Sequence, residues 1–314
     1  MQHFQDLEDV QLPASVLTIG SFDGVHRGHQ DLLRGMLAAA RAREIPAVVL
    51  TFYPHPSVVL RARRPAFYIT SPEEKTDLLA KFGVDIVITQ TFDLELSRVE
   101  APDFLDRLTA RLNFQDLWAG EDFALGHQRR GNRHYLERVS GERGFRFHIM
   151  PPTKLEGEVV SSTRVREALR SGDVSRVATY LGRHFVLPGR VTQGAGRGTQ
   201  LGIPTANLET WEERAYPGRG VYACLVEIQR QRWPAVTNIG VRPTFEDGID
   251  SPIVETHLLD FDGDLYGQEL KVIFIDRLRD ERRFPGQEAL VEQIGRDIQR
   301  AREILGRAEL VLDV

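Results

Sequence analysis

The sequence pattern of the chain changes near residue 184. Before that point, short apolar runs typical of buried strands alternate with longer segments whose apolar residues recur at helical spacing. Strands are expected at 16–20, 47–52, 84–89 and 116–119, and helices at about 28–44, 72–82 and 101–112. Such an alternation favours a parallel sheet with helices on its faces. We therefore expect a Rossmann-like α/β domain over residues 1–183.

After Gly182, glycines and prolines multiply and the predicted strands follow one another closely. These strands are expected at 220–227, 253–259 and 269–275, after two short helical patterns at 162–171 and 173–181 and before a long one at about 287–305. This order predicts a small β-barrel or sandwich over residues 184–314. We expect the last helix to dock on it through four apolar residues, Leu290, Ile294, Ile298 and Ile304.

Composition narrows the function classes. A length of 314 residues exceeds one typical core and supports two domains. The formal net charge of -5 disfavours a dedicated nucleic-acid binder, although local arginines can still form an anion pocket. The single cysteine, Cys224, excludes an internal disulfide framework and a multi-cysteine metal site. Residues 1–11 lack the features of a secretory signal, and no stretch is apolar enough for a transmembrane helix. We expect a cytoplasmic protein without membrane attachment, as a monomer or weak oligomer.

The segment GSFDGVHRGHQ, residues 20–30, lies between the first predicted strand and the first predicted helix. A helix that begins there offers unpaired backbone N–H groups and a positive dipole end, both suited to phosphate. His26 and His29 are three residues apart, so both imidazoles can face the same way and stabilise charge on a phosphoryl group. The residues predicted to bind nucleotide in this segment are Gly20, Phe22, Asp23 and Gly28.

Two other interpretations of this histidine pair remain open from the residues alone. The histidines can be unrelated surface residues, or they can be two ligands of a zinc ion. A third zinc ligand at suitable spacing is not evident. The position between a strand and a helix favours the phosphate site.

A second candidate anion site is the segment SSTRVR, residues 161–166. Ser162 or Thr163 can cap the helix that follows, and Ser161, the backbone amides and Arg166 could then hold the outer phosphates of ATP. The alternative is an ordinary helix cap with solvated arginines.

These two segments resemble the N-terminal module of the bifunctional prokaryotic riboflavin kinase/FMN adenylyltransferases, also called FAD synthetases, within the wider HxGH nucleotidyltransferase group. The segments TFYPHP at 51–56 and GEDF at 120–123 match as well. The resemblance implies that His26, His29 and Arg166 act on ATP. It also implies a flavin pocket lined by His55, Asp122 and Phe123.

The chain departs from the family at one point in this pocket. Members commonly read Asp-Phe-Arg-Phe-Gly, whereas this chain has Ala124 and Leu125 in the third and fourth places. The ligand contacts of the missing arginine are therefore in question, and Arg129 and Arg130 are candidates to replace it.

The second half contains the glycine-rich segment GRVTQGAGRG at 189–198, followed by LGIPTANL at 201–208. The chain has no G-x-x-x-x-G-K-[ST] motif, so phosphates must be bound without a P-loop. Amides of the glycine-rich segment could wrap polyphosphate, and its predicted nucleotide-binding residues are Gly194, Gly196, Arg197 and Gly198. Thr205 and Asn207 are two apart, so in an extended segment both point the same way as oxygen ligands for Mg²⁺. The alternative is a turn with local side-chain caps.

Glu255 lies within a predicted strand and is either solvent-facing or a base toward a primary alcohol. The ordered motifs of this half resemble the riboflavin kinase module of the same family. The resemblance implies Thr205 and Asn207 around Mg·ATP and Glu255 as catalytic base, and with the first module it covers about residues 12–303.

We therefore expect riboflavin and ATP to give FMN, and FMN and ATP then to give FAD and pyrophosphate. Two alternatives remain open. One is an HxGH nucleotidyltransferase for another mononucleotide, such as phosphopantetheine or nicotinate mononucleotide, with a flavin-binding C-terminal domain. The other is a flavin-binding regulator whose catalytic site has decayed.

Overall fold

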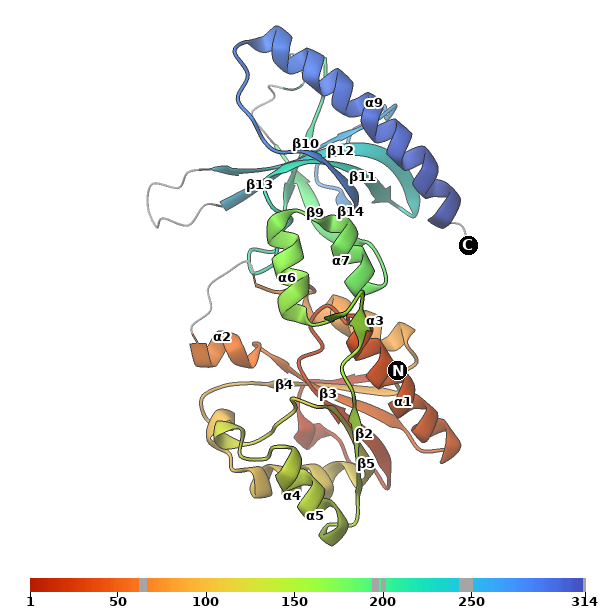
Figure 1. Ribbon diagram of the computed structural model, residues 1–314, viewed down its shortest axis with the longest axis vertical. Helices are drawn as coiled ribbons and strands as arrows, with labels where there is room; N and C mark the ends of the chain where they lie inside the picture. Colours follow the sequence, from red (N-terminus) through yellow and green to blue (C-terminus); the bar gives the residue numbers. More distant parts are fainter. Residues whose placement is uncertain (62–66, 194–197, 199–201, 243–250, 313–314) are drawn as a thin grey trace. The chain divides into compact units, whose positions relative to one another are not determined.

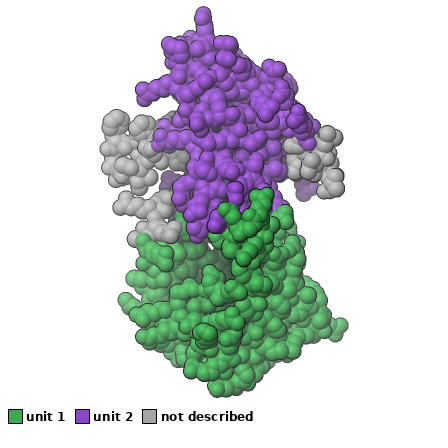
Figure 2. Space-filling view, in the orientation of Figure 1, with its two compact units in different colours: residues 1–162 green, residues 163–314 purple. Residues whose placement is uncertain are grey.

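The structure is a computed structural model that describes residues 1–61, 67–193, 198, 202–242 and 251–312 (Figure 1). By its internal contacts the chain divides into two compact units, residues 1–162 and 163–314 (Figure 2). The expected domain boundary near residue 184 stays a prediction. Within the described ranges, no helix is both long enough and apolar enough to cross a membrane.

The first unit is built on a six-stranded sheet in the order β1-β4-β3-β2-β5-β6, with every neighbouring pair parallel. Its strands are β1 (Gln2–Phe4), β2 (Ser15–Ile19), β3 (Ala47–Tyr53), β4 (Ile86–Thr91), β5 (Phe114–Gly120) and β6 (Arg146–Met150). Its helices are α1 (Arg27–Ala42), α2 (Pro56–Arg61), α3 (Pro72–Lys81), α4 (Ala101–Leu112) and α5 (Arg133–Glu142). Short 3₁₀ turns η1 (Leu7–Asp9), η2 (Leu96–Arg98) and η3 (His127–Arg129), and a hairpin of β7 (Lys154–Leu155) and β8 (Glu158–Val159), complete the unit.

Apolar side chains on both faces explain why this sheet is sandwiched between helices. In β2, Val16 packs with Leu33 and Met36 of α1 and with Leu79 of α3. Its neighbour Leu17 points to the opposite face and packs in the core that α4 and α5 cover. Successive residues of a strand face opposite sides, so a strand buried on both faces reads as a continuous apolar run. The parallel α/β architecture expected from the sequence is confirmed.

The strand order creates a topological switch point between β2 and β5. The chain winds outward from β2 to β3 and β4, then returns to β5 on the other side of β2. The segments that leave β2 and β5 therefore diverge at the carboxyl ends of adjacent strands. Ligands of doubly wound sheets bind in the crevice at such a point.

The second unit is a closed barrel in the order β10-β13-β12-β11-β14-β9, with all pairs antiparallel. Its strands are β9 (Phe185–Thr192), β10 (Ala206–Glu209), β11 (Gly220–Ile228), β12 (Gln231–Arg242), β13 (Ser251–Leu258) and β14 (Glu269–Arg279). The helices α6 (Ser162–Ser171) and α7 (Val174–Leu181) precede it, and α9 (Gln287–Leu312) follows it. Of the two predicted forms, barrel and sandwich, the structure has the barrel.

Helix α9 packs on the outside of the barrel wall. Ala301 and Leu305 are buried against the wall, and Ile298 and Ile304 pack against the same cluster. The remaining two residues expected to dock, Leu290 and Ile294, line a cavity between the helix and the wall instead. Helical spacing identifies the apolar face of α9, but it does not say whether that face meets a wall or a pocket.

Candidate active sites

The turn between β2 and α1 has an unusual backbone. Phe22, Gly24 and Val25 have φ angles of 47°, 79° and 40°, all in the left-handed region. This region is costly for a β-branched residue such as Val25, and such conformations gather at functional sites. The Val25 N–H donates to the Phe22 carbonyl oxygen at 3.1 Å and closes the turn. The turn leads directly to His26, the N-cap residue of α1.

Asp23 anchors this turn to the segment before α3. One of its carboxylate oxygens accepts the N–H groups of Ile69 at 3.0 Å and Thr70 at 3.1 Å. The Ser162 hydroxyl donates to the Asp23 carbonyl oxygen at 2.9 Å. Asp23 thus fixes the shape of the turn, and its predicted contact with nucleotide stays a prediction.

The structure brings His26 and His29 together as a stacked pair. Their ring centroids are 3.7 Å apart with an interplanar angle of 17°. His26 is the N-cap of α1, and its Nδ1 accepts the His29 N–H at 3.3 Å. Because Nδ1 accepts, the proton of the neutral ring lies on Nε2. The buried Nδ1 of His29 has no hydrogen-bond partner among the described residues.

Burial lowers the pKa of His29 well below its usual value of 6.5, and the nearby His26 and Lys75 lower it further. The ring is therefore neutral at pH 7. A neutral imidazole can donate to a phosphate oxygen without the cost of keeping a charge in a desolvated place. The described residues contain no group of three or more His, Cys, Asp or Glu that could hold a metal, so the zinc interpretation of the pair gains no support.

Gly28 leaves room for the His26 ring. A Cβ added at residue 28 would lie 3.2 Å from His26 Cε1 and 3.3 Å from its Nδ1. We expect Gly28→Ala to displace the ring and, because His26 is a predicted catalytic group, to slow the FAD formation expected from the sequence by about tenfold. Steady-state kinetics of FAD formation measure this.

Gly141 supplies the control for this substitution. It also lies in a helix, α5, and an added Cβ there would meet nothing within 4 Å. Gly141→Ala should leave the rate unchanged and stabilise the helix by up to about 1 kcal/mol. Equal rates in both variants would contradict the role assigned to Gly28.

A cavity of about 420 Å³ opens at the carboxyl ends of the strands in the first unit. It gathers four residues that the sequence assigns to ligands, namely Gly20, His55, Asp122 and Phe123. The His55 ring is held in place because its Nδ1 accepts the Ser57 N–H at 3.0 Å. His26 and His29 are not among the described residues that line this cavity.

The departure Ala124-Leu125 lies in the same cavity wall, together with Arg129. The Arg129 guanidinium donates to the Asp122 carbonyl oxygen. Arg130 instead lies 3.7 Å from the Glu100 carboxylate in an exposed pair. Of the two candidates to replace the missing arginine, Arg129 is therefore the one that the structure places at the pocket.

The SSTRVR segment begins helix α6 at Ser162. The Ser162 hydroxyl is already engaged with the turn at Asp23, as described above. Thr163 and Arg166 belong to the second compact unit, where the Arg166 side chain is buried. The contacts of Ser161, Ser162, Thr163 and Arg166 with nucleotide stay predictions.

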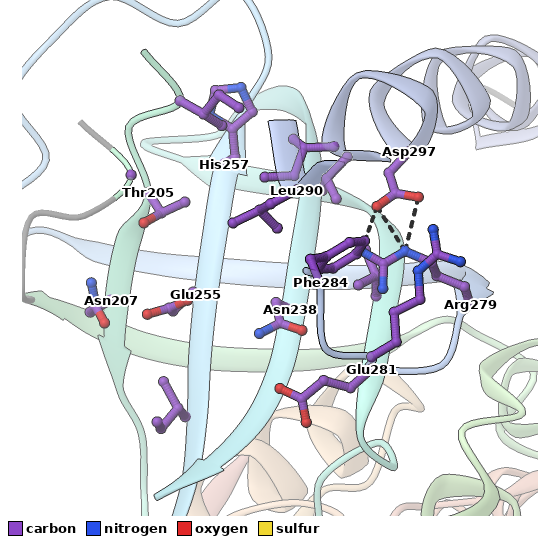
Figure 3. A pocket seen from close by; sticks show the side chains of 17 residues that line it. Thr205, Asn207, Asn238, Glu255, His257, Arg279, Glu281, Phe284, Leu290 and Asp297 are labelled. Atoms are coloured by element: carbon purple, nitrogen blue, oxygen red, sulfur yellow. Dashed lines mark hydrogen bonds and ion pairs between the residues drawn. The ribbon is translucent and has the colours of Figure 1, made fainter. Parts of the chain in front are cut away.

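The barrel carries a row of polar residues on its outer wall. Asn207 of β10 pairs with Glu255 of β13, and Glu255 pairs with Asn238 of β12. All three line one cavity of about 670 Å³, together with Thr205 (Figure 3). Glu255 thus lies between two amides on the wall that also carries Thr205. Its role as a base beside a magnesium nucleotide stays a prediction. Asn238 was not predicted as a site residue.

The opposite side of this cavity is apolar, and charged side chains of both signs surround it. It is formed by Phe284 and by Leu290 and Ile294 of α9. Arg279 and Arg282 lie over the Phe284 ring, with 5.6 Å and 5.0 Å between guanidinium carbon and ring centroid. The cavity therefore joins a hydrogen-bonding wall to a surface suited to a flat, apolar ring system.

Comparison with known proteins identifies the family. Residues 9–164 match the family described as "FAD synthetase", and residues 181–305 match "Riboflavin kinase". A protein of Pseudomonas fluorescens named "Bifunctional riboflavin kinase/FMN adenylyltransferase" is 40% identical over 92% of each chain. Proteins of the same name from Escherichia coli (strain K12) and Bacillus subtilis (strain 168) are 38% and 33% identical over 93% and 91% of each chain. The chain belongs to the bifunctional riboflavin kinase/FMN adenylyltransferase family.

A solved structure supports the fold of this chain. A chain titled "Crystal Structure of Macrolide-efflux Protein from Streptococcus pneumoniae" matches with a TM-score of 0.87 and 32% identity, covering 96% of this chain and 98% of that one. That name describes the Streptococcus pneumoniae protein. Both family matches and the relatives above carry the names of the same two activities, riboflavin kinase and FAD synthesis from FMN.

The glycine-rich segment of the kinase half is described only in part. Gly194, Gly196 and Arg197 lie outside the described residues. Gly198 lines the barrel cavity, and a Cβ there would clash with the Ile203 carbonyl oxygen and lie 3.1 Å from Thr205 Oγ1. Only glycine fits this place beside Thr205 without a shift of backbone.

A bidentate ion pair holds α9 against the kinase barrel. Arg279 of β14 donates from Nε to Asp297 Oδ1 at 3.1 Å, and one of its terminal nitrogens lies 2.8 Å from Oδ2. The side chains are only 18% and 6% exposed. We expect Asp297→Ala to destabilise the barrel by about 3 kcal/mol, because Arg279 keeps a charge that is poorly solvated and unpaired. Chemical denaturation measures the effect.

A second bidentate pair provides the control. Arg302 of α9 binds Asp260 at 2.7 and 2.8 Å, but these side chains are 49% and 68% exposed. Asp260→Ala should cost far less stability than Asp297→Ala, because water already solvates both partners of the exposed pair. Similar losses in both variants would contradict the idea that the buried pair supports the cavity.

Proposed function

We propose that the barrel unit of this protein phosphorylates riboflavin to FMN, and that the α/β unit adenylylates FMN to FAD and releases pyrophosphate. The observation that carries the proposal is the row Asn207–Glu255–Asn238 in one cavity with Thr205. The Glu255 carboxylate in this row can act as a general base that accepts the proton of an alcohol. The predicted limits of the two catalytic domains, 1–183 and 184–314, are part of this proposal.

For the kinase reaction, Glu255 accepts the proton of the ribityl 5′-hydroxyl while the hydroxyl oxygen attacks the γ-phosphorus of ATP. The bond between the γ-phosphorus and the bridging oxygen breaks, and ADP leaves. Asn207 and Asn238 flank Glu255 and orient the hydroxyl and the carboxylate. The apolar side formed by Phe284, Leu290 and Ile294 is suited to the isoalloxazine ring. A volume of about 670 Å³ can hold a molecule of this size.

We also propose that Mg²⁺ binds in this cavity, because the side chains there include oxygen ligands of the kind that Mg²⁺ prefers. Thr205 and Asn207 offer neutral oxygen atoms at the cavity wall. The absence of an acidic cluster among the described residues fits an ion that arrives with ATP and keeps phosphate and water ligands. Bound there, Mg²⁺ would neutralise charge on the polyphosphate.

For the adenylyl transfer, His26 and His29 donate hydrogen bonds to the α-phosphate of ATP while the FMN phosphate attacks it. Three features support this role: the start of α1, the stacked rings and the neutral state of His29. The cavity with His55, Asp122, Phe123 and Arg129 would receive the flavin. Catalysis here rests on positioning and on stabilising charge, without a covalent enzyme intermediate.

The compartment and the assembly are also proposed. Burial raises the pKa of the Cys224 thiol to about 12, so this cysteine is a core residue that resists thiolate chemistry. A cytoplasmic monomer, or a weak oligomer, without nucleic-acid or membrane partners agrees with the composition.

A product assay tests the proposed function. Purified protein is incubated with riboflavin, ATP and Mg²⁺, and flavins are separated by chromatography. FMN followed by FAD is the expected result. Absence of both products would contradict the proposal, and FMN without FAD would contradict its adenylyltransferase half.

A further inference from the structure

A lysine side chain is buried behind the turn that carries the histidine pair. Lys75 lies in the first turn of α3 and is 6% exposed. Its Nζ donates to Thr51 Oγ1 at 2.9 Å and to the carbonyl oxygens of Ser21 and Phe52 at 3.3 and 3.4 Å. These three acceptors match the three N–H donors of an ammonium group. The lysine has no donor left over for a substrate.

Thr51 and Phe52 lie at the carboxyl end of β3, and Ser21 lies two residues after the end of β2. Thr51 also donates its hydroxyl proton to the Ser21 carbonyl oxygen at 3.1 Å. Ser21 directly precedes Phe22, where the left-handed turn begins. Lys75 therefore fixes the first residue of the turn that leads to His26.

Burying the positive charge of Lys75 lowers the stability of the folded state. In the described part of the chain, no carboxylate forms an ion pair with Lys75 Nζ. Burial lowers the pKa of Lys75 to about 8, although Asp23 and Glu73 attract the charge and oppose the shift. A methionine or leucine would fill the same space without desolvating an ammonium group. The hydrogen bonds of Lys75 satisfy three acceptors, but the desolvation of its charge offsets that gain in stability.

The proposed reaction gives a reason for a lysine at this position. It brings together ATP and FMN, both of which carry negative phosphate groups, at the turn that Lys75 supports. A fixed positive charge in a poorly solvated place stabilises such anions at no cost in reorganisation. The same charge acts on His29, whose pKa it helps to lower, so that the ring stays neutral.

We propose that Lys75 is a positioning residue for adenylyl transfer: its buried ammonium group holds the Ser21 and Phe52 carbonyls behind the β2–α1 turn and supplies a fixed positive charge toward the phosphates bound there. This inference rests on the proposed function of the first unit. Lys75 acts through the turn and does not touch the substrate.

The first test compares Lys75→Met with Lys81→Met in the full-length protein. Lys81 is the exposed last residue of the same helix. We expect Lys75→Met to lower kcat for FAD formation on the order of 100-fold with little change in KM, because the catalytic groups lose their position. FMN formation by the barrel serves as an internal control and should stay unchanged in both variants.

Thermal unfolding separates this role from a structural one. Loss of a desolvated charge offsets the loss of its hydrogen bonds, so Lys75→Met should melt no earlier than the wild type. If the variant keeps full FAD formation, or if its lost activity follows a lost folded fraction, the inference is wrong. If the wild type forms no FAD, it is the proposed function that fails.

A pH profile of the wild type provides the second test. As pH rises from 7 to 9, Lys75 loses its proton, since its pKa is about 8, and FAD formation should fall relative to FMN formation. The charged or titratable groups that act on Lys75, or on which it acts, are Asp23, Glu73, His29 and His3. In Lys75→Arg the charge persists, so the fall should be absent. A flat ratio in the wild type would overturn the inference.

Discussion

Glu255→Gln should abolish most FMN formation while FAD formation from supplied FMN continues. The glutamine keeps the shape of the side chain in the row with Asn207 and Asn238, but it cannot accept the proton of the ribityl hydroxyl. A positioned general base contributes about 10²–10⁴-fold, and we expect kcat for riboflavin phosphorylation to fall by that factor. Rates of FMN formation, measured by chromatography under saturating riboflavin and ATP, give the effect.

The matched control is Glu269→Gln. Glu269 is an exposed residue at the start of β14 and does not line the described cavity. This variant should phosphorylate riboflavin at the wild-type rate. A small loss in Glu255→Gln, similar to that of the control, would show that Glu255 is only a solvent-facing strand residue.

His29→Ala should suppress FAD formation and spare FMN formation. The variant loses a neutral imidazole at the start of α1, together with its stacking on His26. Removal of one preorganised donor to a developing charge costs about 10²–10³-fold in kcat. The rate of pyrophosphate release from ATP and FMN measures this loss.

His134→Ala is the control for the histidine. His134 lies on α5 in the same unit, and its side chain is 92% exposed. It should leave both activities unchanged. If His29→Ala and His134→Ala formed FAD equally well, the pair would be two structural histidines, the alternative that the sequence left open.

The sequence predicted the α/β unit well because its strands are buried on both faces. The run at 47–52 became β3, and the helical pattern at 101–112 became α4 with the same bounds. The short strands β1 and β6 were not predicted. Their residues are exposed or half-buried, so they lack the continuous apolar signal of the central strands.

The barrel shows why part of the site escaped prediction. Asn238 lies in β12, which was not expected as a strand because Pro234 interrupts its alternating pattern. Only the register of the barrel places Asn238 opposite Glu255. The alternation in β12, where Val236 and Asn238 line the cavity while Thr237 is buried, is the signal that could have indicated it.

The role of Lys75 was not predicted, for a related reason. In the sequence it is one of several charged residues in an amphipathic helix, a place where a lysine is usually solvated. Its burial depends on how α3 packs against the ends of β2 and β3, which no local pattern records. Thr205, Asn207 and Glu255 could be identified earlier because the resemblance to the family implies a role for each of them.

The central claim is that two independent sites, one at the histidine pair and one in the barrel cavity, act in succession on the flavin. Mixing His29→Ala with Glu255→Gln and supplying riboflavin, ATP and Mg²⁺ tests it most directly. The first variant should make and release FMN, and the second should convert it to FAD, so that FAD forms from riboflavin only in the mixture. Failure of the mixture to form FAD, or loss of both activities in either single variant, would contradict the claim.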